Sequence, residues 1–166
     1  DAIEGFLMQK TTFPVEILIH DDASTDKTAE IVREYEQKFP QLIKPIYQTE
    51  NQYSKGIGVS TTFQFPRARG KYIALCEGDD YWTDPMKMQK QVEFLEENPE
   101  YGLVHGDCHF YYQDKDIWEY NANTNLTNKN NIVNNKDLFY SLVNADYKIR
   151  TATVLFRKEL LENSQK

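Results

Sequence analysis

The chain has 166 residues, a formal net charge of −7, 40% hydrophobic residues and 27% charged residues. This length suits about one domain with a real core, and the composition is ordinary for a globular protein. The acidic balance argues against a nucleic-acid polymer or an anionic membrane as the main partner, although a divalent ion can mask the charge of a small phosphorylated ligand. No apolar stretch is long enough for a transmembrane segment, and we find no signal-peptide pattern.

Hydrophobic periodicity predicts alternating helices and strands along the chain. Strands are predicted over residues 15–20, 42–47, 71–76, 101–112 and 151–156. Helices are predicted from residue 2, over residues 28–39, 61–65, 85–97 and 136–143, and again from residue 157 onward. Residues 121–135 are rich in asparagine, which favours turns, so a loop is expected there. Alternation of this kind predicts an α/β layered sheet that is largely parallel in its first half.

Prolines and cysteines refine this pattern. Pro45 interrupts the second strand and predicts that it lies near a sheet edge. Asp84 and Pro85 predict a helix entered through an aspartate cap with proline at its first position. Cys76 and Cys108 lie in apolar runs without metal-ligand spacing, and two cysteines alone do not make a disulfide framework. Free buried thiols in a reducing compartment are therefore expected.

Two acidic loops follow two of the predicted strands. Asp21 and Asp22 come at the end of the strand 15–20, and residues 77–80, Glu-Gly-Asp-Asp, follow the strand 71–76. In an open parallel sheet both loops lie at the carboxyl edge, where ligands bind. One acidic turn alone is typical of a solvated surface. Two at the same edge favour a binding site, in which carboxylates and substrate phosphates can hold a hard cation such as Mg²⁺.

These two loops also resemble the motifs of one protein family. Residues 20–28, His-Asp-Asp-Ala-Ser-Thr-Asp-Lys-Thr, resemble the Asp-Asp-x-Ser-x-Asp-x-Thr motif of the family 2 inverting glycosyltransferases. Residues 69–82, which end in Cys-Glu-Gly-Asp-Asp-Tyr-Trp, resemble its second motif, a Gly-x-Tyr-Ile strand followed by the "DxD" metal motif. The resemblance runs from about Ala2 to Arg157 and has both motifs in the family's order.

The resemblance implies a GT-A fold, the layered α/β/α fold of nucleotide-diphospho-sugar transferases. This fold has a mainly parallel central sheet and a Rossmann-like first half. We expect residues 1–166 to form a single GT-A domain that is truncated at both ends, so that its first strand and its C-terminal part are missing.

Donor-binding roles carry over to Asp21, Asp22 and Lys55, and also to Glu77 and Asp79 of the second motif. Asp22 is expected to accept a hydrogen bond from a uracil-like base, with Asp21 alongside. Lys55 lies in the loop where the family often has a basic residue near the base or the diphosphate. The family's usual Ala-Arg-Asn form is absent there, and an exposed lysine is the alternative.

The second motif implies a divalent cation, Mn²⁺ or Mg²⁺. Asp79 and Asp80 are expected to hold this ion or the ribose, and the sequence does not decide which carboxylate touches the metal. Glu77 stands where the family usually has an aspartate, so it keeps the charge on a longer side chain. Trp82, beside this loop, suits either stacking on a sugar ring or anchoring of the loop in the core.

The resemblance places the catalytic base downstream of the strand 151–156, so it is expected outside this chain. His105 and Asp107 are weaker candidates, and a structural pair on a strand is the favoured interpretation of them. The implied partners are a nucleotide-sugar donor, of the UDP-sugar class, and a saccharide or lipid-linked acceptor.

The implied setting is bacterial surface-polysaccharide synthesis in the cytoplasm, at the inner face of the membrane. Two alternatives remain open at this point. One is a nucleotide-sugar-binding module without catalysis, and the other is a sugar-phosphate nucleotidyltransferase.

Overall fold

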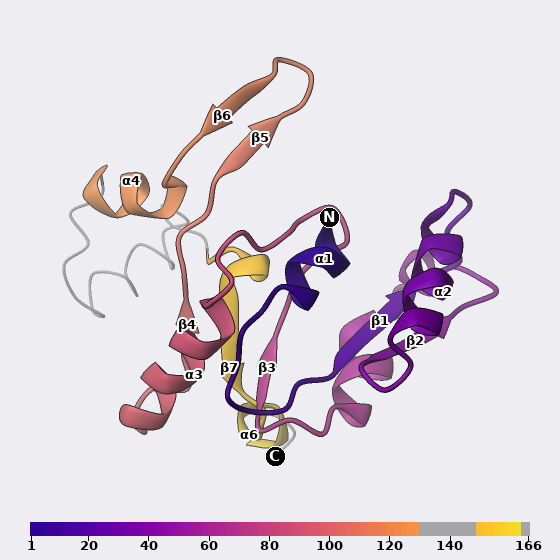
Figure 1. The fold of residues 1–166 in the computed structure, drawn as a ribbon, viewed down its shortest axis with the longest axis horizontal. Helices are drawn as coiled ribbons and strands as arrows, with labels where there is room; N and C mark the ends of the chain where they lie inside the picture. The colour runs from indigo at the N-terminus through magenta and orange to yellow at the C-terminus, as the bar shows by residue number, and fades with distance from the viewer. Residues whose placement is uncertain (130–148, 164–166) are drawn as a thin grey trace.

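The computed structural model describes residues 1–129 and 149–163 (Figure 1). The helices are α1 (Ala2–Leu7), α2 (Thr28–Lys38), α3 (Lys87–Glu97), α4 (Ala122–Lys129) and α6 (Glu159–Asn163). The strands are β1 (Ile17–Asp21), β2 (Ile43–Tyr47), β3 (Tyr72–Ala74), β4 (Leu103–His105), β5 (Phe110–Tyr112), β6 (Ile117–Glu119) and β7 (Val154–Arg157). Short helical turns cover Tyr53–Lys55, Ser60–Gln64, Phe65–Arg67 and Thr151–Thr153. The predicted helix over residues 136–143 lies outside the described residues.

The first unit is the parallel pair β1–β2 with helix α2 packed on it. Pro45 lies in β2, whose ladder in the described residues is with β1 alone, as expected for an edge strand. The guanidinium of Arg67 donates to the carbonyl oxygens of Ile19 (3.2 Å) and Lys44 (2.7 Å), so it ties both strands to the Phe65–Arg67 turn. Arg67 therefore has a structural role here.

The second unit is a three-stranded sheet in the order β3-β7-β4. The central strand β7 runs antiparallel to both neighbours, so β3 and β4 run in the same direction. A mainly parallel sheet was predicted, but among the described residues parallel pairing is observed between β1 and β2 alone. The reason is that β7, from the C-terminal end of the chain, lies between β3 and β4, and a strand from so far along the chain can enter in either direction.

The core lies around β7. Its buried side chains face two clusters, one of Ile73, Val154 and Phe156 and the other of Val92, Leu95 and Leu155. Arg157 is also buried, and its guanidinium donates to the carbonyl oxygens of Tyr101 (2.9 Å) and Leu95 (2.5 Å). The bond to Leu95 satisfies a carbonyl that the C-terminal end of α3 leaves unpaired.

The predicted strand over residues 101–112 is wrong in its extent. The chain leaves the sheet after His105 and forms the hairpin β5–β6, which projects away from the sheet (Figure 1). Asp107 explains the break, because its Oδ1 accepts the backbone N–H of Asn123 (2.8 Å) and its Oδ2 accepts the hydroxyl of Thr124 (2.5 Å). This contact caps α4, so part of the predicted asparagine-rich loop is helical.

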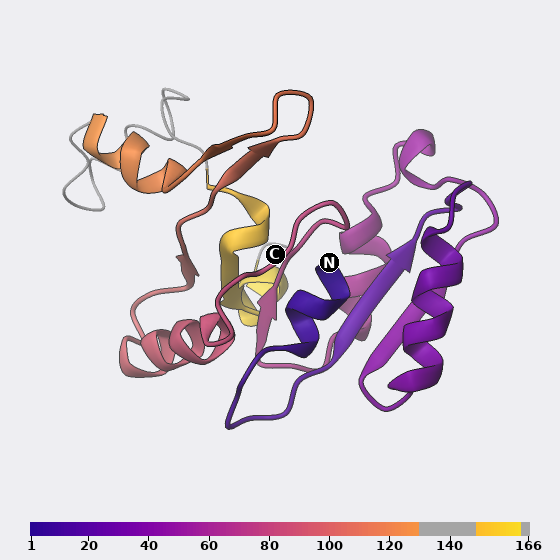
Figure 2. The same cartoon turned by 45° about the horizontal axis from the view of Figure 1, so that its top comes forward.

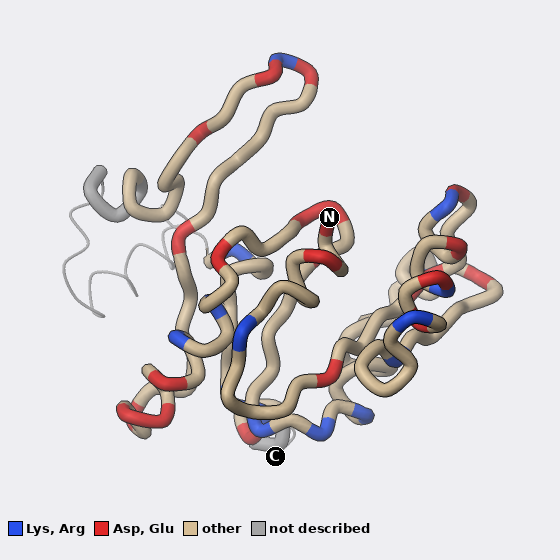
Figure 3. Tube along the Cα trace, viewed as in Figure 1, with Lys and Arg blue, Asp and Glu red and all other residues tan. Residues whose placement is uncertain are grey.

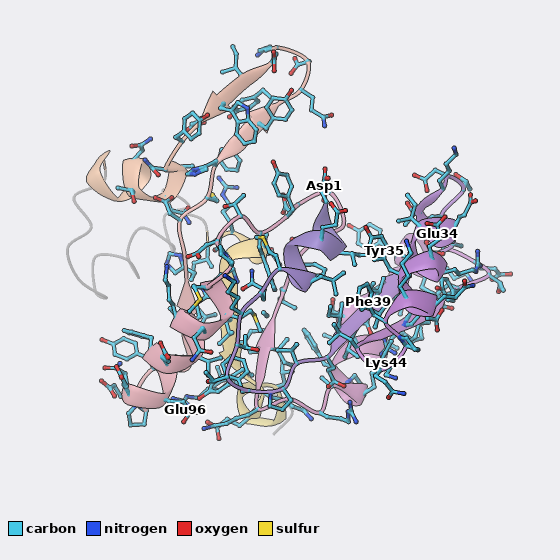
Figure 4. All side chains as sticks on the ribbon, viewed as in Figure 1. Asp1, Glu34, Tyr35, Phe39, Lys44 and Glu96 are labelled. Carbon is cyan, nitrogen blue, oxygen red and sulfur yellow. The ribbon has the colours of Figure 1, made fainter. Side chains whose placement is uncertain are left out.

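Contacts between helices and loops connect the two units. The Tyr35 hydroxyl on α2 donates to Glu4 Oε1 on α1 (3.1 Å), and Figure 4 shows Tyr35 on the side of α2 that faces α1.

The start of α3 differs from the prediction. Met86, and not Asp84, is the residue at the cap position, and Asp84 Oδ1 accepts the Met86 N–H (2.8 Å). Within the described residues, no helix has the length and apolar character needed to cross a bilayer.

Candidate functional site

The two acidic loops begin at the carboxyl ends of β1 and β3. In both ribbon views these two strands run toward the same side of the molecule (Figures 1 and 2). The loop after β3 then passes α1, because Tyr81, Trp82 and Thr83 line a hollow of about 540 Å³ together with residues of α1. Figure 3 shows acidic positions in the loop beside the N-terminus. In the described residues β1 and β3 belong to two different sheets, so the meeting of the two loops at one sheet edge stays a prediction.

Asp22 is held in place by backbone amides. Its Oδ1 accepts the N–H of Gln52 (2.8 Å), and its Oδ2 accepts the N–H of Tyr53 (2.9 Å). Partial burial acts to raise the pKa of Asp22, but these two hydrogen bonds and His20 outweigh it, so the pKa lies below its usual value. A carboxylate has about four lone-pair sites, so Asp22 keeps acceptor capacity for a ligand.

The side chains next to Asp22 are buried polar groups. His20 has a side chain only 5% exposed, and its Nε2 lies 3.5 Å from Asp22 Oδ1, which is long for a hydrogen bond. Asp21 is 4% exposed. Its Oδ1 and both ring nitrogens of His20 have no hydrogen-bond partner in the part of the chain that the structure describes. Buried polar atoms of this kind are rare in native proteins and mark a place where a bound group would add partners.

Lys55 lies in the turn that Asp22 holds. The turn covers Tyr53–Lys55, and the Lys55 ammonium forms an ion pair with Glu50 in the same loop. The structure thus brings the predicted basic loop to Asp22, while the lysine charge is engaged by its own loop. Sequence reasoning missed the amides of Gln52 and Tyr53, because backbone donors carry no residue-type signal.

The Glu77–Asp80 loop is an exposed acidic turn closed by a hydrogen bond from the Asp80 N–H to the Glu77 carbonyl (3.2 Å). Partial burial, and then the charges of Asp79 and Glu77, raise the pKa of Asp80. Among the described residues, none of the three carboxylates forms a salt bridge, and no group of three or more His, Cys, Asp or Glu side chains is arranged to hold a metal ion.

The side chain of Trp82 anchors this loop. Its indole N–H donates to the Ala152 carbonyl (2.8 Å), and its ring packs edge-on against Phe6 at 4.8 Å between centroids. Gly5 lies so close that a Cβ there would be 2.9 Å from the Trp82 backbone nitrogen. Of the two roles open to Trp82, the structure therefore supports anchoring. Tyr81, by contrast, is exposed.

Lys87 is a half-buried cation that sequence reasoning missed. Its ammonium lies 4.2 Å from the centroid of the Trp82 ring and donates to Gln91 Oε1 (2.8 Å). Burial lowers its pKa to about 8. Burial, followed by the charges of Asp80 and Glu77, raises the pKa of the nearby Cys76 thiol to about 12. Lys87 looks like an ordinary exposed helical lysine in the sequence, and only the packing of α3 against the loop reveals its burial.

The weaker base candidates lie on the far side of β7 from β3. Asp107 caps α4, and its hydrogen bonds hold its pKa low although partial burial acts to raise it. His105 Nδ1 lies 3.3 Å from the carbonyl oxygen of Gly106. Both groups contact local structure, but Asp107 lies beyond β4 and bonds to α4, so their interpretation as a structural pair on a strand stays a prediction.

The sequence pattern of the family described as Glycosyl transferase family 2 matches residues 1–163 of this chain. The chain therefore belongs to that family, as its two motifs predicted. Membership implies the GT-A fold, of which the structure shows the α/β composition and the short parallel pair.

Named relatives agree with this assignment. An uncharacterised protein of Mycobacterium tuberculosis is 47% identical over 116 residues, which is 69% of this chain and 32% of that protein. An uncharacterised glycosyltransferase of a Nostoc species is 34% identical over 104 residues, 63% of this chain and 30% of that protein. The UDP-Glc:α-D-GlcNAc-diphosphoundecaprenol β-1,3-glucosyltransferase of Escherichia coli is 35% identical over 95 residues, 57% of this chain and 35% of that protein. The matched region spans about a third of the length of these relatives.

Proposed function

We propose that this chain is the donor-binding portion of an inverting glycosyltransferase that uses a nucleoside diphosphate sugar of the UDP-sugar class. The observation that supports this most is the Asp22 carboxylate, fixed by the amides of Gln52 and Tyr53 at the end of β1. A fixed acceptor at the carboxyl edge of a sheet suits the N–H of a nucleotide base. The E. coli relative, by its name, uses UDP-glucose.

The Glu77–Asp80 loop is the proposed site for the diphosphate end of the donor and for Mn²⁺ or Mg²⁺. Carboxylates are hard oxygen ligands of the kind that such an ion takes, and no described cation forms a salt bridge with these three. Burial, and then the charges of Asp79 and Glu77, raise the pKa of Asp80. Asp79 and Asp80 would hold the ion, with substrate oxygens completing its coordination. When bound, a divalent ion acts as a Lewis acid that stabilises negative charge on the leaving diphosphate.

The proposed transfer is a single in-line displacement. The acceptor hydroxyl oxygen forms a bond to the anomeric carbon while the bond from that carbon to the diphosphate oxygen breaks, and the nucleoside diphosphate leaves. The hydroxyl proton passes to a carboxylate base. Asp107 is poorly suited to this role, because its carboxylate already accepts hydrogen bonds at α4. The base is therefore proposed to come from beyond the described strand β7.

The test is turnover of a UDP-sugar by the full-length protein, with Mn²⁺ and with EDTA. Asp79→Asn and Asp80→Asn are expected to lose most of the turnover, since each removes a charge from the proposed ion site. Glu100→Gln, an exposed carboxylate away from both acidic loops, is the matched control and should keep full turnover. Equal rates in all four proteins, or equal rates with EDTA, would contradict the metal-assisted mechanism.

Cellular location is part of the same proposal. We place the protein in the cytoplasm at the inner face of the membrane, where it would build bacterial surface polysaccharide on a saccharide or lipid-linked acceptor. The support is the name of the E. coli relative, whose acceptor is a diphosphoundecaprenol-linked N-acetylglucosamine.

A further inference from the structure

The hairpin β5–β6 carries a band of exposed aromatic rings on one face. Tyr111 and Trp118 are directly paired across the two strands, so their side chains lie on the same face, and Tyr120 follows two residues later on that face. Their rings are nearly parallel. The ring centroids of Tyr111 and Trp118 are 4.7 Å apart with an interplanar angle of 24°, and those of Trp118 and Tyr120 are 6.0 Å apart with an angle of 16°. The exposed fractions are 42%, 40% and 59%. Scattered single exposed hydrophobic residues are ordinary on a protein surface, whereas contiguous exposed patches often mark interaction sites.

The opposite face of the hairpin is different. Phe110 on that face is covered by the Arg150 guanidinium, 4.8 Å from its ring centroid, and the Tyr112 hydroxyl donates to Glu119 (3.0 Å). A two-stranded hairpin is only marginally stable in water unless its faces are packed. The cover on this face is only partial, because Tyr112 and Ile117 on it are 43% and 52% exposed.

Polar groups flank the aromatic band at both ends. Asp116 at the tip accepts the Tyr111 hydroxyl (3.0 Å) and has acceptor capacity left for other donors. His109 at the base accepts the Asn121 N–H through Nδ1 (3.0 Å), so in the neutral ring the proton is on Nε2, where it can be donated. Aromatic rings with a carboxylate and an imidazole beside them match a neutral sugar, which presents apolar C–H faces and hydroxyl groups.

The hairpin also begins close to the Glu77–Asp80 loop. Strands β3 and β4 run in the same direction on either side of β7, so the acidic loop and the segment leading to β5 leave the sheet at the same edge. Burial, and then the charges of Asp107 and Asp80, raise the pKa of Cys108, which lies at the base of the hairpin. Figures 1 and 2 both show the hairpin standing clear of β1, β2 and α2 on that side.

We propose that the His109, Tyr111, Trp118 and Tyr120 face binds the neutral saccharide of the acceptor beside the donor site. The proposal rests on the proposed glycosyltransferase function for the identity of the ligand. A membrane surface fits less well, because the charged residues at the hairpin tip and on β6 are Asp114, Lys115, Asp116 and Glu119, with net negative charge, and anionic lipids attract basic segments.

The experiment is calorimetric titration of the full-length protein with N-acetylchitotetraose and, separately, with UDP and Mn²⁺. Trp118→Leu keeps apolar cross-strand packing, and Tyr120→Ser lies just outside the ladder, so neither depends on loss of the hairpin fold. Both are expected to raise the saccharide Kd by at least about fivefold, since each removes aromatic contact area. Ile117→Ser, an exposed apolar residue on the opposite face, is the control and should stay within about twofold. The Kd for UDP should not change.

Several outcomes would overturn the proposal. They are equal saccharide affinity in all variants, no saccharide binding by the wild type at millimolar concentration, self-association that Trp118→Leu abolishes, or Trp118-dependent binding to phosphatidylglycerol vesicles. The two titrations also separate this proposal from the donor site. If UDP does not bind but the saccharide binds in a Trp118-dependent way, the proposed glycosyltransferase function fails while the saccharide site remains.

Discussion

Replacement of Lys87 by methionine tests the packing beneath the acidic loop. Burial lowers the pKa of Lys87 from 10.5 to about 8 in the folded protein. A difference of this size corresponds to about 3 kcal/mol between the two protonation states, as an order of magnitude. The contacts of the Lys87 ammonium with the Trp82 ring and with Gln91 Oε1 offset part of this free-energy cost. At pH 7 we therefore expect Lys87→Met to raise the free energy of unfolding by about 1–3 kcal/mol.

The dependence on pH follows from the same pKa. Because the folded-state pKa is below the unfolded one, the unfolded chain binds more protons between pH 8 and 10.5, and the stability of the wild type rises with pH across that window. Lys87→Met lacks this increase, so the stability difference between the two proteins should shrink toward zero by about pH 10.

The assay is urea unfolding of the full-length protein, followed by circular dichroism at pH 7, 8, 9 and 10. Lys90→Met is the matched control, because Lys90 is three residues along α3, exposed and paired with Asp84. The difference in free energy of unfolding between Lys90→Met and the wild type should not change between pH 7 and pH 10. The reasoning is refuted if Lys87→Met destabilises the protein at pH 7, or if its difference from the wild type is independent of pH.

Three further predictions concern packing and reactivity. Gly5→Ala should lower the free energy of unfolding by about 1–3 kcal/mol, because the new Cβ would lie 2.9 Å from the Trp82 backbone nitrogen. Gly78→Ala is the control, because a Cβ at Gly78 would meet open space, and it should leave this free energy unchanged. Equal effects of the two substitutions would count against the close contact at Gly5. Arg157→Met should cost about 2–4 kcal/mol in urea unfolding, since the Leu95 and Tyr101 carbonyls lose their buried donor; an unchanged midpoint would show that they find other partners. At pH 8, iodoacetamide should alkylate Cys76 at least about a hundredfold more slowly than free cysteine, as measured by peptide mass spectrometry, because its pKa is raised to about 12; labelling at the rate of free cysteine would disprove this.

Local patterns predicted much of the fold. Helices α2 and α3, strands β1 to β3 and the position of both acidic loops follow from apolar periodicity and turn residues within single segments. The placement of β7 between β3 and β4 could not be predicted in this way, because it is a pairing between distant parts of the chain. The break after His105 was missed for a related reason: Asp107 caps a helix that begins some fifteen residues later.

Part of the candidate site was likewise predictable from the sequence, and part was not. The carboxylates at the ends of β1 and β3 were visible as residue types at the expected positions. What holds Asp22 is a pair of backbone amides about thirty residues away, and what lies under the second loop is a lysine that looks exposed in the sequence. Trp82 was ambiguous until its indole was found to donate to Ala152. Burial and partner identity depend on tertiary packing, and a single sequence does not contain them directly.

We propose that the Asp22 loop and the Glu77–Asp80 loop form one nucleotide-diphosphate site. The most direct measurement is calorimetric binding of UDP to the full-length protein, with and without Mn²⁺, for the wild type, Asp22→Asn and the combined Asp79→Asn and Asp80→Asn variant. We expect Mn²⁺ to tighten UDP binding in the wild type, Asp22→Asn to weaken it with or without the ion, and the combined variant to bind UDP without any response to Mn²⁺. Equal affinity for UDP in all three proteins, whether or not Mn²⁺ is present, would show that the two loops do not form such a site.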